Sequence, residues 1–128
     1  MKTIAIANRK GGVGKSTTAA ALVSGLTLKG YKVLAVDLDA QRNLTSTMRA
    51  RADSKTALGV LTGDITAKEA IRHTESGDII PASKNLSGAD ATLTETGKEY
   101  RLKEALEPVK GSYDYCIIDC PPALGILT

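Results

Sequence analysis

The sequence contains no phenylalanine and no tryptophan, and its four tyrosines are the only aromatic residues. A hydrophobic core must therefore be built from Ile, Leu, Val and Ala. Such residues suit a parallel sheet covered by helices, and they argue against an aromatic-rich β-sandwich. The same absence leaves the chain without the aromatic platforms on which single-stranded nucleic acids stack.

Cysteine, histidine and long apolar runs are also scarce. Cys116 and Cys120 flank the end of a predicted strand, and residues so close along one strand do not reach disulfide geometry. A four-cysteine zinc site would need two more cysteines, so we expect free thiols in a cytosolic protein. The only histidine, His73, lies in a polar stretch and is expected at the surface.

No run approaches the roughly 18 apolar residues of a membrane span, and the apolar run after Met1 is too short for a secretory signal. We therefore expect a cytoplasmic protein without a membrane segment. The net charge of +3 is too small to identify a nucleic-acid binder and is typical of a solvated, slightly basic surface. The length of 128 residues suffices for one domain, over residues 1–128. Its apolar end, residues 123–128, resembles an element cut short, so we expect an incomplete domain.

Strand and helix patterns alternate along the chain. Short apolar runs predict strands over residues 3–7, 32–38, 78–82 and 115–119, the first of them buried. Helical patterns cover residues 16–29, 44–51, 56–61, 66–72 and 99–109. Thr66 and Glu69 fit a capping box, and Gly30 and Gly63 are placed to end helices. This alternation predicts an α/β fold: right-handed βαβ units forming a parallel sheet with helices on both faces.

A glycine-rich segment follows the first predicted strand and opens the first predicted helix. It contains Lys10, Gly11, Gly12, Val13, Gly14, Lys15, Ser16 and Thr17. Glycines let successive backbone N–H groups curl around phosphate oxygens, and the helix N-terminus adds its positive dipole end. Lys15 then suits the β- and γ-phosphates of a nucleotide, the Ser16 hydroxyl suits Mg²⁺, and Thr17 could contact the α-phosphate. The segment predicts a P-loop that binds ATP and Mg²⁺, although Arg9 stands where the general motif has glycine.

Aspartates end two of the other predicted strands. Asp37 and Asp39 lie on the same side of their strand, because side chains alternate, and they fall where parallel sheets bind ligands. Asp119 follows an apolar run, as in a Walker B motif, and should reach a water on Mg²⁺. Capping of the next helix is the alternative for Asp39.

Together these motifs resemble the deviant Walker A ATPases, and in particular the ParA/Soj partition ATPases. The resemblance rests on residues 10–16, on Asp37-Leu38-Asp39-Ala40-Gln41-Arg42-Asn43 and on Asp119-Cys120-Pro121-Pro122. Ala40 replaces the usual proline. The resemblance implies that Lys10 reaches the phosphates of a partner subunit, that Asp39 orients or deprotonates the attacking water, and that Asp37 helps to hold Mg²⁺ through water.

At the level of the whole protein, the resemblance implies an ATPase that forms a homodimer through an ATP sandwich. It also implies nonspecific binding of nucleoid DNA, through a surface mostly beyond this half, and a ParB/Spo0J-like stimulating protein. Whether this chain alone hydrolyses ATP stays open.

Three other functions remain under consideration. A MinD-like ATPase needs an amphipathic membrane helix, and Gln41 with Asn43 favours the partition branch. A metabolic enzyme on the same scaffold could be an amide-forming ligase or a redox ATPase, but Cys116 inside a strand does not suit a cluster shared between subunits. A noncatalytic nucleotide-binding remnant is the third.

The first strand should also affect association. In the family's sheet this strand is central, and one of its two neighbours comes from the other half. We therefore expect the 128-residue chain by itself to associate through a bare strand edge, and to hydrolyse ATP negligibly because its adenine pocket is incomplete.

Overall fold

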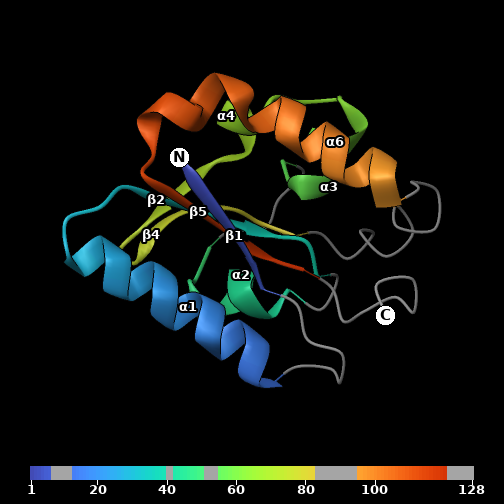
Figure 1. Cartoon of the computed structure of the whole chain (residues 1–128). Helices are drawn as coiled ribbons and strands as arrows, with labels where there is room; N and C mark the ends of the chain where they lie inside the picture. The colour runs from blue at the N-terminus through green and yellow to red at the C-terminus, as the bar shows by residue number, and fades with distance from the viewer. Residues whose placement is uncertain (7–12, 40–41, 51–54, 83–94, 121–128) are drawn as a thin grey trace.

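The computed structural model describes residues 1–6, 13–39, 42–50, 55–82 and 95–120 (Figure 1). The strands are β1 (Lys2–Ile6), β2 (Val33–Asp37), β3 (Arg72–Thr74), β4 (Gly77–Ile80) and β5 (Tyr115–Asp119). The helices are α1 (Val13–Leu28), α2 (Asn43–Thr47), α3 (Ala57–Thr62), α4 (Ala67–Ala70), α6 (Glu95–Leu106) and the 3₁₀ segment η1 (Glu107–Ser112). Side chains of residues 13–17 and 95–100 lie outside the description.

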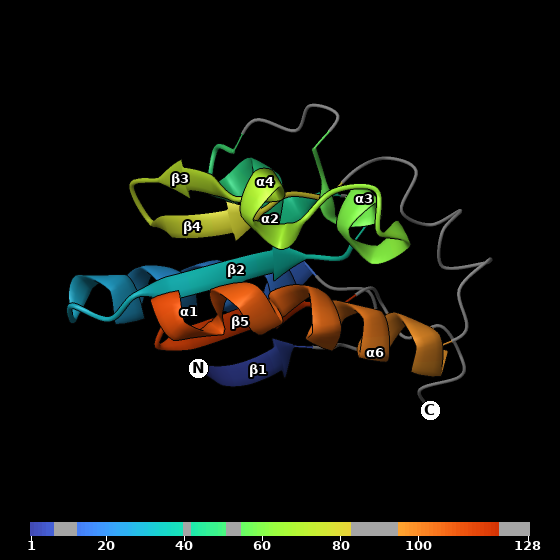
Figure 2. The ribbon, with the colours of Figure 1, turned by 90° about the horizontal axis from the view of Figure 1, so that it is seen from above.

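The strands form one sheet in the order β1-β5-β2-β4-β3 (Figure 2). β1, β5, β2 and β4 run parallel, as the alternating pattern predicts, whereas β3 pairs antiparallel with β4. The sequence-based prediction placed Arg72 at the end of a helix and is wrong there, because α4 ends at Ala70. Thr74 and Gly77 instead close a tight hairpin, in which the Thr74 hydroxyl donates to the Gly77 carbonyl at 2.6 Å.

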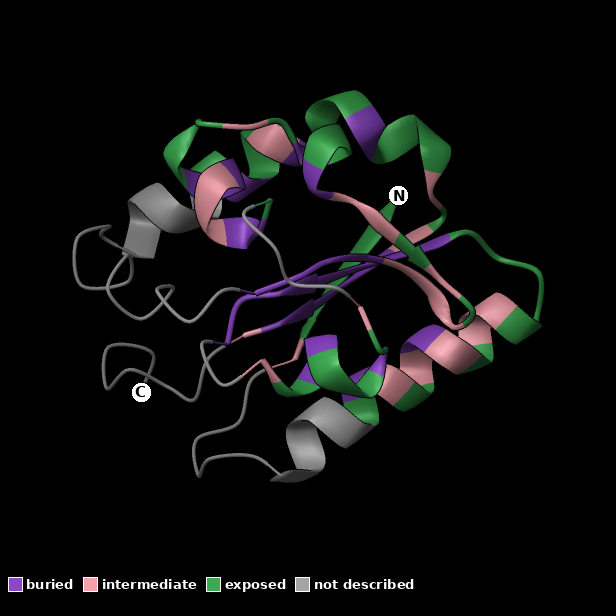
Figure 3. Ribbon diagram, turned by 180° about the vertical axis from the view of Figure 1, so that it is seen from behind, coloured by how far each residue is buried: buried purple, intermediate pink, exposed green. Residues whose placement is uncertain are grey.

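β1 lies at one edge of the described sheet and pairs only with β5 there. The prediction of a buried first strand is therefore wrong: its residues are largely exposed, with Ile4 at 38% (Figure 3). β2 differs because it has neighbours on both sides and helices on both faces, and all five of its residues are buried. The expected association through the β1 edge stays a prediction.

Helices cover both faces of the sheet, as predicted. α1 and α2 lie against one face, and α3, α4, α6 and η1 lie against the other (Figures 1 and 2). The alternation of β2 explains the two cores, because Val33 and Ala35 face α1 whereas Leu34 and Val36 face the opposite layer. The predicted apolar stripe of the last helix joins the second core through Leu102, Leu106 and Val109.

Several helix ends form as the sequence predicts. Gly30, at φ 94°, ends α1 in a Schellman motif: its N–H donates to the Thr27 carbonyl, and the Tyr31 N–H donates to the Leu26 carbonyl. The capping box of Thr66 and Glu69 is present at the start of α4. The last helix differs, because α6 gives way to η1 where Pro108 removes an N–H donor.

No helix in the described residues is long and apolar enough to cross a membrane.

Candidate nucleotide and magnesium site

Three parallel strands bring their carboxyl ends to one edge of the sheet, which we call the carboxyl edge. In the β2–β5 register Asp37 pairs with Asp119, and in the β1–β5 register Ile6 pairs with Asp119. Backbone bonds continue past the strands, since the Leu38 N–H donates to the Asp119 carbonyl at 3.0 Å. Asp119 thus lies between the strand that leads to the glycine-rich segment and the strand that leads to Asp37.

Asp37 is fully buried, and hydrogen bonds engage both of its carboxylate oxygens. Oδ1 accepts from the Asp39 N–H at 3.0 Å. Oδ2 accepts from the Thr45 N–H at 2.9 Å and from the Thr45 hydroxyl at 2.6 Å. Burial raises the pKa of Asp37 to about 6, and the nearby Asp119 carboxyl adds to the rise, while these three hydrogen bonds oppose it.

Asp39 is almost as buried, at 5% exposure, and its main chain is held on both sides. Its N–H donates to Asp37, and its carbonyl accepts from the Arg42 N–H at 2.8 Å. Arg42 adopts a left-handed backbone conformation, with φ 59°, which turns the chain into α2. The sequence analysis offered helix capping as the alternative role of Asp39. The N-cap residue of α2 is Arg42, whose side chain makes no capping bond, and the alternative for Asp39 stays open.

Sequence analysis did not single out Thr45. Its signal is weak, because a threonine eight residues after an aspartate is common. The structure shows it contacting Asp37 by both its N–H and its hydroxyl, while Oγ1 also accepts from the Ala82 N–H at 3.1 Å.

The glycine-rich segment is described only in part. Lys10, Gly11 and Gly12 lie outside the described residues. Val13 begins α1, and Gly14 to Thr17 continue it, with only their backbone described. This helix begins on the side of the molecule where the strands end (Figure 1). The described backbone of Val13 to Thr17 and the three aspartates therefore lie on the same side of the molecule.

The donor set fits Mg²⁺ as a partner of a bound nucleotide. Asp37 and Asp119 supply hard oxygen atoms, and Mg²⁺ is usually held by one or two carboxylates together with water and substrate phosphates. The described residues contain no cluster of three or more metal-ligating side chains, so a dedicated all-protein cage is not formed among them. Because both Asp37 oxygens already accept hydrogen bonds, contact through water suits this residue better than direct coordination.

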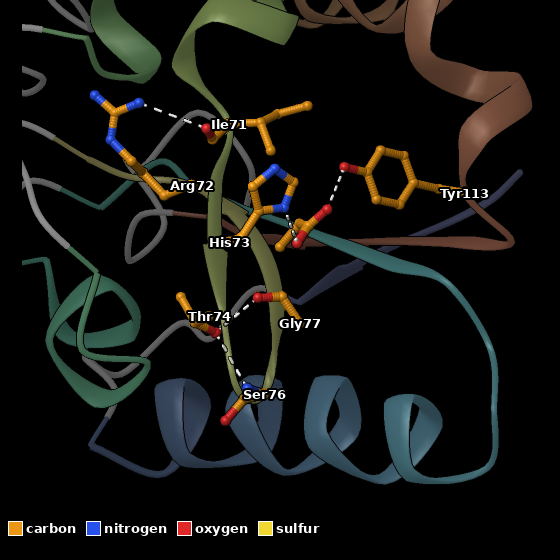
Figure 4. Close-up of polar contacts among 8 residues, drawn as sticks. Ile71, Arg72, His73, Thr74, Ser76, Gly77 and Tyr113 are labelled. Carbon is orange, nitrogen blue, oxygen red and sulfur yellow. Dashed lines mark hydrogen bonds and ion pairs between the residues drawn. The ribbon is translucent and has the colours of Figure 1, made fainter.

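Of the other reactive groups, Cys116 and His73 lie apart from this edge, whereas Cys120 directly follows Asp119. Cys116 and Cys120 are free, as expected, and burial raises the pKa of the Cys116 thiol to about 12, so it stays protonated. His73 is exposed on β3, also as expected. It contacts Asp78 near the opposite edge of the sheet, where Tyr113 also donates to Asp78 (Figure 4).

A mostly parallel sheet with helices on both faces and aspartates at its carboxyl edge, in a chain with a P-loop motif after the first strand, is typical of a P-loop NTPase. The family model described as an AAA domain (AAA_31) matches residues 1–128. The chain belongs to this family.

Two relatives show which members of the family the chain resembles. The chain is 48% identical over 132 residues to the sporulation initiation inhibitor protein Soj of Bacillus subtilis, covering 99% of this chain and 52% of Soj. It is 42% identical over 135 residues to the chromosome partitioning protein ParA of Caulobacter vibrioides, covering 100% of this chain and 51% of ParA. The chain thus spans about half the length of these relatives. The resemblance to ParA/Soj proteins is confirmed.

Among solved structures, cobyrinic acid a,c-diamide synthase from Mycobacterium smegmatis, with bound ADP and magnesium, superposes with a TM-score of 0.88. It is 43% identical, and the match covers 99% of this chain and 54% of that one.

Proposed function

We propose that this chain is the nucleotide-binding half of a partition ATPase of the ParA/Soj type, in which ATP controls the association of two subunits. The carrying observation is the match to Soj over nearly the whole chain, together with Asp37, Asp39 and Asp119 at one edge of the sheet. Asp119 pairs with Ile6, the last residue of the strand that precedes the P-loop motif in the sequence. This arrangement suits phosphoryl transfer, in which the protein contributes positioning and charge stabilisation.

In this proposal the P-loop holds the phosphates. Backbone N–H groups from Gly11 to Thr17 surround them, and the Lys15 ammonium neutralises the β- and γ-phosphates. Mg²⁺ would be held by Ser16 directly and by Asp37 and Asp119 through water, and when bound it neutralises charge on the phosphates. The buried Asp37 carboxylate is consistent with this role, because a nearby cation offsets the cost of its burial.

Two further residues are assigned to hydrolysis. Asp39 orients or deprotonates the attacking water, and its fixed main chain supports a positioning role. Lys10 acts across the subunit interface by neutralising charge on the transferring phosphoryl group of the partner. The Lys10 assignment is supported by sequence resemblance.

The proposed switch acts on DNA in the cytoplasm. The ATP-bound dimer binds nucleoid DNA nonspecifically through phosphate contacts, and a ParB-like partner stimulates hydrolysis and release. The names of the Soj and ParA relatives support this assignment. The proposal covers partition of either plasmid or chromosomal DNA.

An amide-forming ligase is the second candidate. It is favoured by the high TM-score of 0.88 to cobyrinic acid a,c-diamide synthase. A ligase of this class would use ATP to activate a carboxylate, and its turnover would depend on an acceptor acid and an amide donor. The greater identity to Soj favours partition.

Sizing of the intact protein by light scattering, with and without Mg²⁺–ATP, tests the dimer switch. We expect ATP to shift the protein to a dimer and to create salt-sensitive binding to random-sequence duplex DNA. Lys10→Ala should keep nucleotide affinity but lose dimerisation and hydrolysis, whereas Lys29→Ala, at an exposed position after α1, should behave as the parent. Equal loss of affinity and dimerisation in Lys10→Ala would make Lys10 a local phosphate ligand. ATP turnover that requires a carboxylic acid and an amide donor, without DNA binding, would favour the ligase.

A further inference from the structure

The Thr45 hydroxyl joins three segments that are distant in sequence. It donates to Asp37 Oδ2 at 2.6 Å and accepts from the Ala82 N–H at 3.1 Å. Asp37 ends β2, Thr45 lies in α2, and Ala82 follows β4. All three residues are buried, so water does not readily replace these bonds.

The direction of these bonds follows from the donors available. A hydroxyl has one proton to donate and two lone pairs that accept. Because the Ala82 N–H can only donate, Oγ1 accepts from it and keeps its own proton for Asp37. Oδ2 therefore accepts two hydrogen bonds from one residue, the hydroxyl and the Thr45 N–H. This pair holds the Asp37 carboxylate in one orientation.

The orientation of the Asp37 carboxylate also determines its contact with Asp39. With Oδ2 directed at Thr45, the second oxygen, Oδ1, accepts from the Asp39 N–H at 3.0 Å. The Leu38 N–H is already committed to the Asp119 carbonyl, so the chain between the two aspartates is held at both ends. A change at Thr45 would therefore be transmitted through Asp37 to the main chain of Asp39.

We propose that Thr45 is a positioning residue for hydrolysis, whose hydroxyl orients Asp37 and thereby holds Asp39, and ties both to the end of β4. The inference rests on the proposed function for its catalytic consequence. Its structural part, the hold on Asp39, can be measured without nucleotide.

The test compares Thr45→Val, which keeps the side-chain shape and removes the hydroxyl, with Thr45→Ser, which keeps the hydroxyl. Thr27→Val is the matched control, because the Thr27 hydroxyl is also buried and has no hydrogen-bond partner among the described residues. We expect Thr45→Val to lower the rate of ATP hydrolysis by about tenfold to a hundredfold, as small misplacements of catalytic groups do, with Mg²⁺–ATP affinity within about threefold of the parent. Thr45→Ser should restore most of the rate, and Thr27→Val should match the parent.

Amide hydrogen exchange in the nucleotide-free protein supplies the second readout. The Asp39 and Ala82 amides should be protected in the parent, exchange faster in Thr45→Val, and regain protection in Thr45→Ser. Thr45→Ala replaces Thr45→Val if the latter does not fold. Parental turnover in the variant that lacks the hydroxyl, or a serine variant as slow as valine, would overturn the proposal. Unprotected Asp39 and Ala82 amides in the parent would also overturn it, even if no variant folds. If the parent hydrolyses no ATP, the proposed function fails, while the exchange data still decide whether Thr45 holds Asp39.

Discussion

Asp37 and Asp78 lie at opposite edges of the same sheet, and their surroundings differ in a way that separates a site from a structural contact. Asp37 ends β2 at the carboxyl edge and is fully buried. Its hydrogen-bond partners in the described part of the chain are two backbone N–H groups and one hydroxyl, and its strand neighbour is another buried aspartate, Asp119.

Asp78 lies near the start of β4, with its side chain 22% exposed. It accepts from the Tyr113 hydroxyl at 2.6 Å and contacts the His73 ring at 2.7 Å (Figure 4). The His73 ring carries a positive charge when protonated, and water reaches the Asp78 carboxylate. This contact ties the β3–β4 hairpin to the start of β5. Burying two neighbouring carboxylates is costly by itself, and a bound cation would offset that cost, so the carboxyl edge is the better candidate for binding a cation.

The largest expected effect at the carboxyl edge is on nucleotide affinity. Lys15→Ala should weaken Mg²⁺–ATP binding by about a hundredfold or more, because it removes charge-assisted hydrogen bonds to the phosphates. Lys32→Ala changes an exposed lysine at the opposite edge and should leave affinity unchanged. Titration calorimetry on both variants measures the contrast. Parental affinity in Lys15→Ala would remove it from the phosphate site.

The second-largest expected effect is on the rate of ATP hydrolysis, which should also differ between the two edges. Asp39→Ala should lower turnover by about 10²- to 10⁴-fold, the range for loss of a general base, while ATP binding and dimerisation persist. Asp78→Asn should leave turnover in place, since its network lies at the other edge. A steady-state phosphate-release assay measures both rates. Normal turnover in Asp39→Ala would exclude it from the mechanism.

The sequence predicted the carboxyl edge better than the opposite one. Apolar runs at strand ends precede Asp37, Asp39 and Asp119. Because this pattern is visible in the local sequence of each strand, these residues could be predicted without knowledge of tertiary contacts. β3 was missed because its three residues, Arg72–Thr74, carry no apolar alternation and pair only through the hairpin with β4. Thr45 was missed because its contacts with Asp37 and Ala82 depend on tertiary packing. The apolar run of β1 predicted a buried strand, and that burial was wrong because a run does not show how many neighbours a strand has. The bare edge expected for this chain by itself agrees with the place of β1 in the described sheet.

The third effect concerns stability and pH. Burial raises the pKa of the Asp37 carboxyl from 3.8 to about 6, so folding favours its protonated form. Its contribution to stability is therefore fully present below pH 3.8 and is lost as pH rises through about 6. Without Mg²⁺ and nucleotide, the parent's free energy of unfolding should fall by about 1 kcal/mol more than that of Asp37→Asn between pH 5 and pH 7.5.

Urea unfolding at several pH values measures this difference in slope. The absolute stability of Asp37→Asn is not the readout, because its amide also places a donor near the backbone N–H groups that Asp37 accepts from. Identical pH dependence in the two proteins would mean that folding does not raise the pKa of the Asp37 carboxyl.

The smallest effect belongs to the opposite edge. Tyr113→Phe removes the hydroxyl that donates to Asp78 and keeps the ring, so it should lower the free energy of unfolding by about 1 kcal/mol, the net value of one hydrogen bond. The loss is limited because water can reach the partly exposed Asp78 carboxylate. His73→Ala should cost less still, since the His73 side chain is 82% exposed and pairs of exposed groups contribute little. Neither change should alter ATP affinity or turnover. A loss of turnover in Tyr113→Phe at unchanged stability would show that the two edges are coupled, and the separation between site and structural contact would then be wrong.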